Sequence, residues 1–181
     1  GCLDLSKEDR IALGDQFVDV GIAEEQSIAM AGGAAKAGAK PLVFTSVTFM
    51  QRAYDQISHD ICINSLPITI LLTSASFASM RDVTHLGIFG IAEFSNIPNL
   101  VIISPSSKEE LLSALDWSVD QREHPVMILM PGNEVNSREQ ILSIGELDKF
   151  ELTQQGEKLA IIGLGGFYQK GEGLAKAVEE K

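Results

Sequence analysis

The chain is dominated by short apolar runs of strand length, which alternate with segments of helical pattern. The strand-like runs are Phe17–Val20, Pro41–Thr45, Pro67–Thr73, Asn99–Ser104, Pro125–Met130 and, after a polar stretch, Lys158–Gly163. Helical patterns cover Ala23–Lys36, Phe49–Ile63, Gly90–Phe94 and Lys108–Val119. Strands that alternate with helices form right-handed βαβ units, which favour a mostly parallel sheet with helices on both faces. The sequence therefore predicts an α/β fold arranged as a three-layer sandwich.

Composition excludes several classes of function. The formal net charge of −11 argues against a nucleic-acid or anionic-membrane surface, because both need clustered Lys and Arg. Two cysteines and three histidines show no metal-ligand spacing, so we expect no metal site built by this chain alone. The apolar runs are too short to span a bilayer and no signal peptide opens the chain, so we expect a cytoplasmic protein. The chain ends inside a helical pattern, and we expect it to be a piece of a longer protein.

Polar and aromatic side chains follow the first three strand-like runs. They are Glu24, Ser46, Phe49, Arg52, Asp82 and His85. Because the carboxyl ends of parallel strands share one edge of a sheet, these side chains can converge there. Structural explanations also exist: a carboxylate such as Glu24 stabilises the first turn of a helix, and Phe49 fits an apolar core.

Four motifs occur in one order along the chain: Phe17–Glu25, Ser46–Gln56, Asp82–His85 and Ile97–Ser106. Together they resemble the pyrimidine-binding (central) domain of the transketolase superfamily, and most closely the 1-deoxy-D-xylulose-5-phosphate synthases. The resemblance implies the thiamine diphosphate-binding fold. It also implies a division into a pyrimidine-binding domain (1–132), a linker (133–157) and the beginning of the transketolase C-terminal domain (158–181).

The resemblance implies a cofactor-binding role for three residues. Glu24 matches the glutamate that hydrogen-bonds N1′ of the thiamine diphosphate aminopyrimidine and favours the tautomer that removes the C2 proton. Phe49 matches the aromatic residue that stacks on the pyrimidine ring. Ile22 lies in the same turn as Glu24 and is predicted to contact the cofactor.

The resemblance also implies a substrate side. Arg52 and His85 match residues that face phosphate or hydroxyl groups of the substrate, and His85 is a second catalytic candidate. Asp82 belongs to the same loop as His85, and Ser46 stands where the family often has tyrosine. All departures from the family pattern fall on this side: Glu25-Gln26, the shortened loop around Asp82, Ser46, and Pro131-Gly132 without the usual intervening arginine.

The leading hypothesis is a thiamine diphosphate-dependent transferase that joins decarboxylated pyruvate to glyceraldehyde 3-phosphate, a reaction of isoprenoid biosynthesis. The family places the diphosphate group and Mg²⁺ on a domain absent from this chain, so we expect the chain alone to be inactive and the whole enzyme to be a homodimer. Alternatives are a transketolase proper, the β-type subunit of a 2-oxo acid dehydrogenase, and a non-catalytic binding module.

Overall fold

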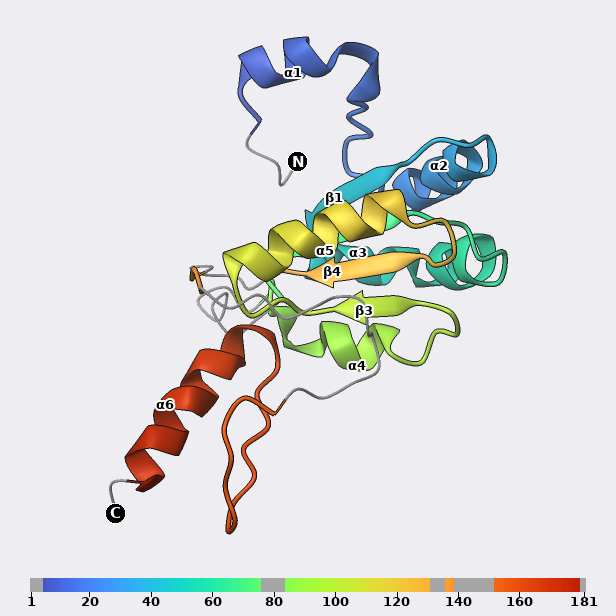
Figure 1. Cartoon of the computed structure of the whole chain (residues 1–181). Helices are drawn as coiled ribbons and strands as arrows, with labels where there is room; N and C mark the ends of the chain where they lie inside the picture. The colour runs from blue at the N-terminus through green and yellow to red at the C-terminus, as the bar shows by residue number, and fades with distance from the viewer. Residues whose placement is uncertain (1–4, 76–83, 131–135, 139–151, 180–181) are drawn as a thin grey trace.

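The computed structural model describes residues 5–75, 84–130, 136–138 and 152–179 of the chain (Figure 1). Its centre is a four-stranded sheet in the order β1-β2-β4-β3, in which every pair of neighbours is parallel. The strands are β1 (Leu42–Ser46), β2 (Thr69–Thr73), β3 (Val101–Ile103) and β4 (Val126–Leu129). The predicted α/β fold with a parallel sheet is confirmed.

Helices of three kinds accompany the strands. The α-helices are α1 (Lys7–Leu13), α2 (Glu24–Lys36), α3 (Val47–Met50), α4 (Gly90–Phe94), α5 (Lys108–Asp120) and α6 (Tyr168–Glu179). The shorter 3-10 segments are η1 (Gly14–Gln16), η2 (Gln51–Ala53), η5 (Gly87–Phe89) and η6 (Gly165–Phe167), and η3 (Gln56–Cys62) is a π-helix. The single helix expected over 49–63 is therefore divided among α3, η2 and η3. Within the described part of the chain, no helix has the length and apolarity needed to cross a membrane.

Each face of the sheet has its own apolar core. Ile70 and Leu72 of β2 lie in one core, together with Ile28 of α2. Leu71, between them in sequence, lies in the other core with Leu111 of α5. Successive side chains of a strand point to opposite faces, so β2 is buried on both. The three layers are helix, sheet and helix.

Helix α5 begins at the carboxyl end of β3 with a well-formed N-terminal cap. The hydroxyl of Ser107 accepts a hydrogen bond from the backbone N–H of Glu110 (3.1 Å). The carboxylate of Glu110 accepts in turn from the backbone N–H (2.6 Å) and the hydroxyl (2.8 Å) of Ser106. These reciprocal bonds satisfy donors that a helix start otherwise leaves unpaired, and they fix where α5 leaves the sheet.

Two strand predictions are wrong. Phe17–Val20 and Lys158–Gly163 have strand-forming composition, but no strand of the described residues pairs with either run. The backbone of Phe17 is extended (φ −99°, ψ 118°), so its local conformation agrees with the prediction while the pairing does not. A strand needs a neighbour for its N–H and C=O groups, and apolar composition alone does not supply one.

Residues 152–179 form a small unit next to the end of β3. Gly165 lies so close to Ser104 that a Cβ atom on this glycine would fall 2.1 Å from the serine hydroxyl. The guanidinium of Arg138 stacks over the ring of Tyr168 (4.1 Å) and forms an ion pair with Glu172 (3.4 Å). These contacts hold the unit against the sheet domain. The boundaries at 132 and 157 stay a prediction, since most of the expected linker lies outside the described residues.

Candidate active site

Glu24 is the first residue of α2, directly after a sharp turn. Gly21 has a left-handed backbone (φ +69°), which glycine adopts without strain, and its N–H donates to the Asp19 carboxylate (2.9 Å). The side chain of Glu24 is only 10% exposed. Its Oε2 atom is buried, and the described residues supply no hydrogen-bond donor to it. A buried carboxylate oxygen without a donor is unfavourable, so this atom is poised to accept a hydrogen bond from a bound group.

Arg52 is the one cation that the structure brings to Glu24 among the described residues. Its Nη1 atom lies 3.7 Å from Oε2 of Glu24, beyond ordinary hydrogen-bonding distance, while its side chain stays 56% exposed. The two residues meet because α2 packs against α3 and η2, and Arg52 belongs to η2. The sequence did not indicate this pairing, since 28 positions separate the two residues. The guanidinium therefore lies between the buried carboxylate and solvent.

Phe49 and His85 form the second contact of the site. Their rings are 5.1 Å apart between centroids and meet edge to face at 80°. Nδ1 of His85 also lies 2.7 Å from the Thr84 hydroxyl, so the imidazole has a polar contact in addition to its contact with Phe49. Phe49 comes from α3, after β1, and His85 from the segment after β2. Residues after two neighbouring parallel strands thus converge, as the sequence predicted.

Two glycines that the sequence reasoning missed make this convergence possible. A Cβ atom on Gly87 would lie 1.7 Å from the Ser74 carbonyl oxygen and 2.8 Å from the Val47 side chain. A Cβ atom on Gly90 would lie 2.4 Å from Val47. Only glycine permits this approach of η5 and α4 to the start of α3, two residues before Phe49. The sequence signal that could have indicated this close approach is the pair of glycines three positions apart.

The remaining predicted residues have different surroundings. Ser46 is buried at the end of β1, with its hydroxyl 3.2 Å from that of Thr48. Ile22 is 86% exposed, so nothing within the described part of the chain covers it. Asp82 lies outside the described residues. The structure therefore brings together Glu24 with Arg52 and Phe49 with His85, while the contribution of Asp82 stays a prediction.

The side chains of Glu24 and Phe49 fit the aminopyrimidine of thiamine diphosphate. The ring is flat and carries hydrogen-bonding nitrogen atoms, which suits the buried Oε2 of Glu24 and the partly buried ring of Phe49. Ile22, two residues before Glu24 in the sequence, offers exposed apolar surface. Within the described ranges, no group of three or more His, Cys, Asp or Glu side chains is arranged to hold a metal ion. The site as described is suited to the organic part of the cofactor.

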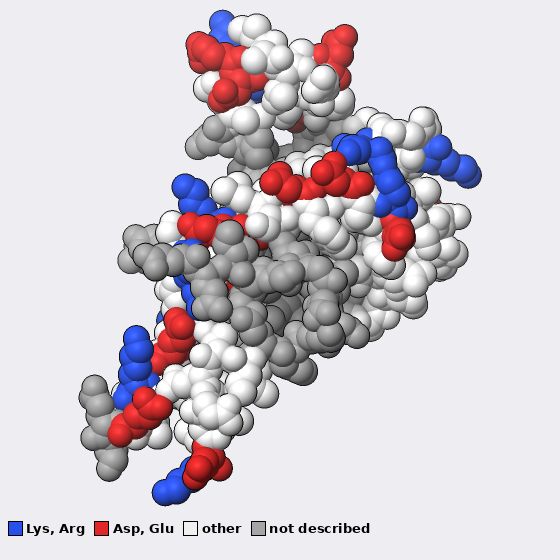
Figure 2. Space-filling view, viewed as in Figure 1, with Lys and Arg blue, Asp and Glu red and all other residues white. Residues whose placement is uncertain are grey.

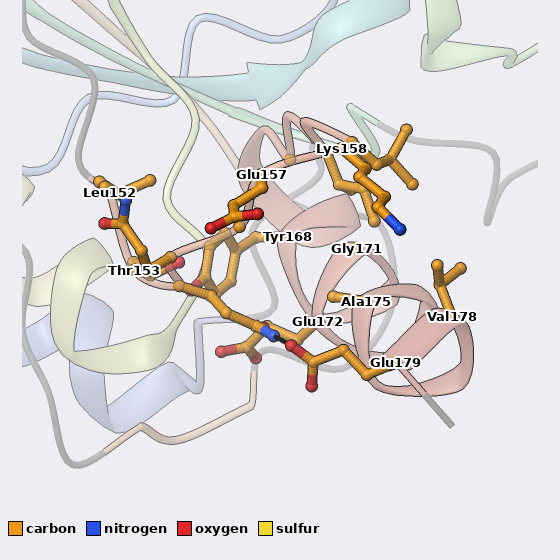
Figure 3. A pocket seen from close by; sticks show the side chains of 16 residues that line it. Leu152, Thr153, Glu157, Lys158, Tyr168, Gly171, Glu172, Ala175, Val178 and Glu179 are labelled. Carbon is orange, nitrogen blue, oxygen red and sulfur yellow. Dashed lines mark hydrogen bonds between the residues drawn. The ribbon is translucent and has the colours of Figure 1, made fainter. Parts of the chain in front are cut away.

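A cavity of about 400 Å³ lies in the second unit, lined by residues between Leu152 and Glu179 (Figure 3). Glu157, Tyr168, Glu172 and Glu179 are among its labelled side chains, and α6 forms one wall. None of the residues that line it is a predicted site residue. The cavity is therefore separate from the Glu24–Arg52 and Phe49–His85 contacts.

Comparison with solved structures places this architecture in the class of transketolase folds. A split-gene transketolase, described as an inactive β4 tetramer, matches with a TM-score of 0.78 and 26% identity over 98% of this chain and 59% of that chain. Transketolase from Pichia stipitis, in a complex with sedoheptulose 7-phosphate, matches with a TM-score of 0.66 over 76% of this chain and 21% of that one. At 23% identity, the second match supports the fold alone.

Sequence comparison identifies the family. Residues 4–137 match the model of the transketolase pyrimidine-binding domain, and the chain belongs to this family. The 1-deoxy-D-xylulose-5-phosphate synthase of Clostridium perfringens strain SM101 is 38% identical over 97% of this chain, and that of Clostridium acetobutylicum is 36% identical over 86%. The chain spans only 28% and 25% of the lengths of these two relatives. The resemblance found in the sequence motifs is confirmed.

Proposed function

We propose that this chain is the pyrimidine-binding part of a thiamine diphosphate-dependent transferase of the 1-deoxy-D-xylulose-5-phosphate synthase type. The observation that carries the proposal is the buried Oε2 of Glu24, which lacks a donor among the described residues at the turn that opens α2. The relatives that bear the synthase name support the assignment of the reaction class.

Three residues hold the cofactor in this proposal. Thiamine diphosphate, when bound, supplies a nucleophilic carbon and accepts electrons during bond cleavage. Glu24 accepts a hydrogen bond at Oε2 from the N1′ position and holds the proton there. Phe49 stacks on the ring, and Ile22 covers its edge. Burial of Glu24 beneath Arg52 keeps water away from this hydrogen bond, which strengthens it.

The substrate side lies toward solvent. The half-exposed guanidinium of Arg52 suits a phosphate or carboxylate. His85, whose ring contacts that of Phe49, would serve as a proton donor or acceptor. Ser46 and Asp82 complete the proposed substrate contacts. The substrates in this proposal are pyruvate and glyceraldehyde 3-phosphate, and the product enters isoprenoid biosynthesis in the cytoplasm.

The proposal requires polypeptide beyond this chain. Mg²⁺ and the diphosphate group would be held by a separate domain, and two copies would form a homodimer. Residues 158–181 would begin the C-terminal domain. A chain of similar fold, the split-gene transketolase, is described as inactive in its β4 form, which supports our expectation that this chain alone is inactive.

A transketolase proper is the second candidate, favoured by the match of 98% of this chain to that split-gene transketolase. The two candidates differ in substrates: only the synthase releases CO₂ from pyruvate. A transketolase would instead transfer a two-carbon unit from xylulose 5-phosphate to ribose 5-phosphate.

The test uses the full-length parent protein with thiamine diphosphate and Mg²⁺. We expect CO₂ release from pyruvate with glyceraldehyde 3-phosphate, and a loss of about 10²- to 10⁴-fold in kcat for Glu24→Gln. Glu25→Gln is the matched control, because Glu25 is an exposed neighbour in the same helical turn and should keep activity. Turnover only with the pentose phosphates would support the transketolase. Failure to bind the cofactor, or unchanged activity in Glu24→Gln, would contradict the proposed role of the site.

A further inference from the structure

Glu24 is a buried charge whose surroundings are only partly explained by the proposed hydrogen bond to the cofactor. Its side chain is 10% exposed, and no described residue donates a hydrogen bond to Oε2. The residue before it, Ala23, provides no side-chain cap, so the first turn of α2 contributes only its dipole. A buried carboxylate that no opposite charge compensates destabilises the fold. The Glu24 carboxylate therefore needs a countercharge even when no ligand is bound.

Arg52 provides this countercharge. Its Nη1 atom lies 3.7 Å from Oε2 of Glu24, which is too long for a hydrogen bond but close enough for attraction between opposite charges. The interaction therefore depends on the charge of the guanidinium rather than on directed hydrogen bonds. The Arg52 side chain is 56% exposed, so water screens part of the attraction, whereas the side chain of Glu24 is largely shielded from water.

Arg52 forms its described ion pair with this buried carboxylate, although exposed carboxylates are common on the chain. Asp and Glu outnumber Lys and Arg by 25 to 14, and Figure 2 shows acidic side chains spread over the face drawn there, from α1 to α6. Asp55, three positions after Arg52, pairs instead with His59 (2.7 Å). Within the part of the chain that the structure describes, no other ion pair uses Arg52.

Packing of the neighbouring residues fixes where the two charges meet. Met50 and Ala53, close to Arg52 in sequence, are fully buried, as is Ile28 one turn after Glu24. These three apolar residues belong to the same core, and η2 packs against α2. The core therefore sets the positions of both backbones, so the approach of the two charges is built into the fold.

We infer that Arg52 is a positioning residue of the reaction and acts through Glu24. Its charge holds the Glu24 carboxylate in place to accept the hydrogen bond from N1′. This inference rests on the proposed function, and it adds a second role to the substrate contact proposed for Arg52. Without the guanidinium, the carboxylate would be less stable in its buried position. Its hydrogen bond to N1′ would then weaken, and removal of the C2 proton would slow even when no substrate is present.

The two roles of Arg52 have different requirements. An arginine that binds a phosphate or carboxylate uses its planar, forked donors, which lysine lacks. Compensation of the Glu24 charge at 3.7 Å needs only a positive charge near Oε2. Arg52→Lys should therefore raise KM for an anionic substrate while it keeps most of kcat, whereas Arg52→Met should lower kcat as well.

The first measurement is the exchange of the C2 proton of bound thiamine diphosphate for deuterium, followed by NMR in the full-length parent protein without substrate. We expect Arg52→Met to slow the exchange about 10-fold or more, a smaller effect than the roughly 10²- to 10⁴-fold expected for Glu24→Gln. Arg52→Lys should restore most of the rate. Gln51→Met is the matched control and should leave the exchange unchanged, because Gln51 is an exposed, uncharged neighbour in η2.

The second measurement uses the same protein without cofactor. Thermal unfolding is compared among the parent, Glu24→Gln, Arg52→Met and the double variant, which form a double-mutant cycle. In the parent, Arg52→Met leaves a buried carboxylate uncompensated, so we expect a clear fall in Tm. In the Glu24→Gln background the neutral amide needs no countercharge, so the same substitution should lower Tm much less.

Slower C2 exchange in Arg52→Met, its rescue by lysine and unequal Tm shifts in the cycle would support the inference. Normal exchange in Arg52→Met with only KM raised would show that Arg52 serves the substrate alone. Slow exchange that lysine does not rescue would assign Arg52 a structural role, and equal Tm shifts would show that the two charges do not interact. Each of these three results overturns the inference while the role of Glu24 stands. Failure of thiamine diphosphate to bind, or normal exchange in Glu24→Gln, would overturn the proposed function as well.

Discussion

The central unit, Glu24–Met130, and the segments that flank it carry the same kind of sequence signal but differ in burial. Ile70 and Ile162 both lie in apolar runs of strand length, yet Ile70 is 0% exposed and Ile162 is 79% exposed. The first run has a strand on each side, whereas the second has none within the described residues. Strand formation therefore depends on the presence of neighbouring strands as well as on apolar composition.

Truncation of these two isoleucines tests the comparison directly and should give the largest effect. Ile70→Ala removes a side chain from a closed core, so we expect the free energy of unfolding to fall by about 2–5 kcal/mol. Ile162→Ala, the same chemical change at an exposed site, should alter it by less than about 0.5 kcal/mol. Urea unfolding followed by circular dichroism measures both. Equal losses would mean that 152–179 shares the cooperative core.

The second prediction concerns close approach within the central unit. A methyl group on Gly87 meets the Ser74 carbonyl and Val47, so Gly87→Ala should destabilise the fold by about 1–3 kcal/mol and displace His85 from Phe49. Gly33→Ala is the control, since its Cβ atom meets no atom within 4 Å and a helix favours alanine. Thermal unfolding gives the stability, and histidine NMR signals report the ring contact. Loss of stability in the Gly33 variant alone would contradict the packing described.

The sequence predicted the layers and most elements because their signals are local. The period of the apolar residues and the strand-sized runs are enough to place β1, β2, α2 and α5. The sequence did not predict the pairing of Glu24 with Arg52, because this pairing depends on how α2 packs against η2. The unpaired state of Phe17–Val20 was also missed, because composition does not reveal whether a neighbouring strand is present.

The third prediction compares the caps of two helices. Ser107 caps α5, which packs on the sheet, and Ser6 caps α1 through a capping box with Asp9. Ser107→Ala should lower the free energy of unfolding by about 1 kcal/mol, because a buried helix start loses an acceptor. Ser6→Ala removes a similar bond from a helix that buries nothing. We expect only local fraying there, seen as faster hydrogen exchange in 7–13, with the unfolding midpoint unchanged. A matching shift of the midpoint would show that α1 is part of the cooperative unit.

The smallest effect should come from surface charge, even in the central unit. Lys40 donates a hydrogen bond to Asp120 (2.8 Å), which joins the loop before β1 to the end of α5. That bond, with the attraction of the two charges, lowers the pKa of the Asp120 carboxyl below its usual range near 4. A lowered pKa in the folded state adds stability above the unfolded pKa, and this stability is lost as the pH falls through the folded pKa.

Lys40→Met should therefore raise the Asp120 pKa in an NMR titration, and its small stability difference from the parent chain should vanish in acid. Lys36→Met, which removes a lysine that forms no ion pair with Asp120, should leave that titration unchanged. If Lys40→Met were as harmful as Ile70→Ala, charge rather than burial would separate the central unit from its flanks.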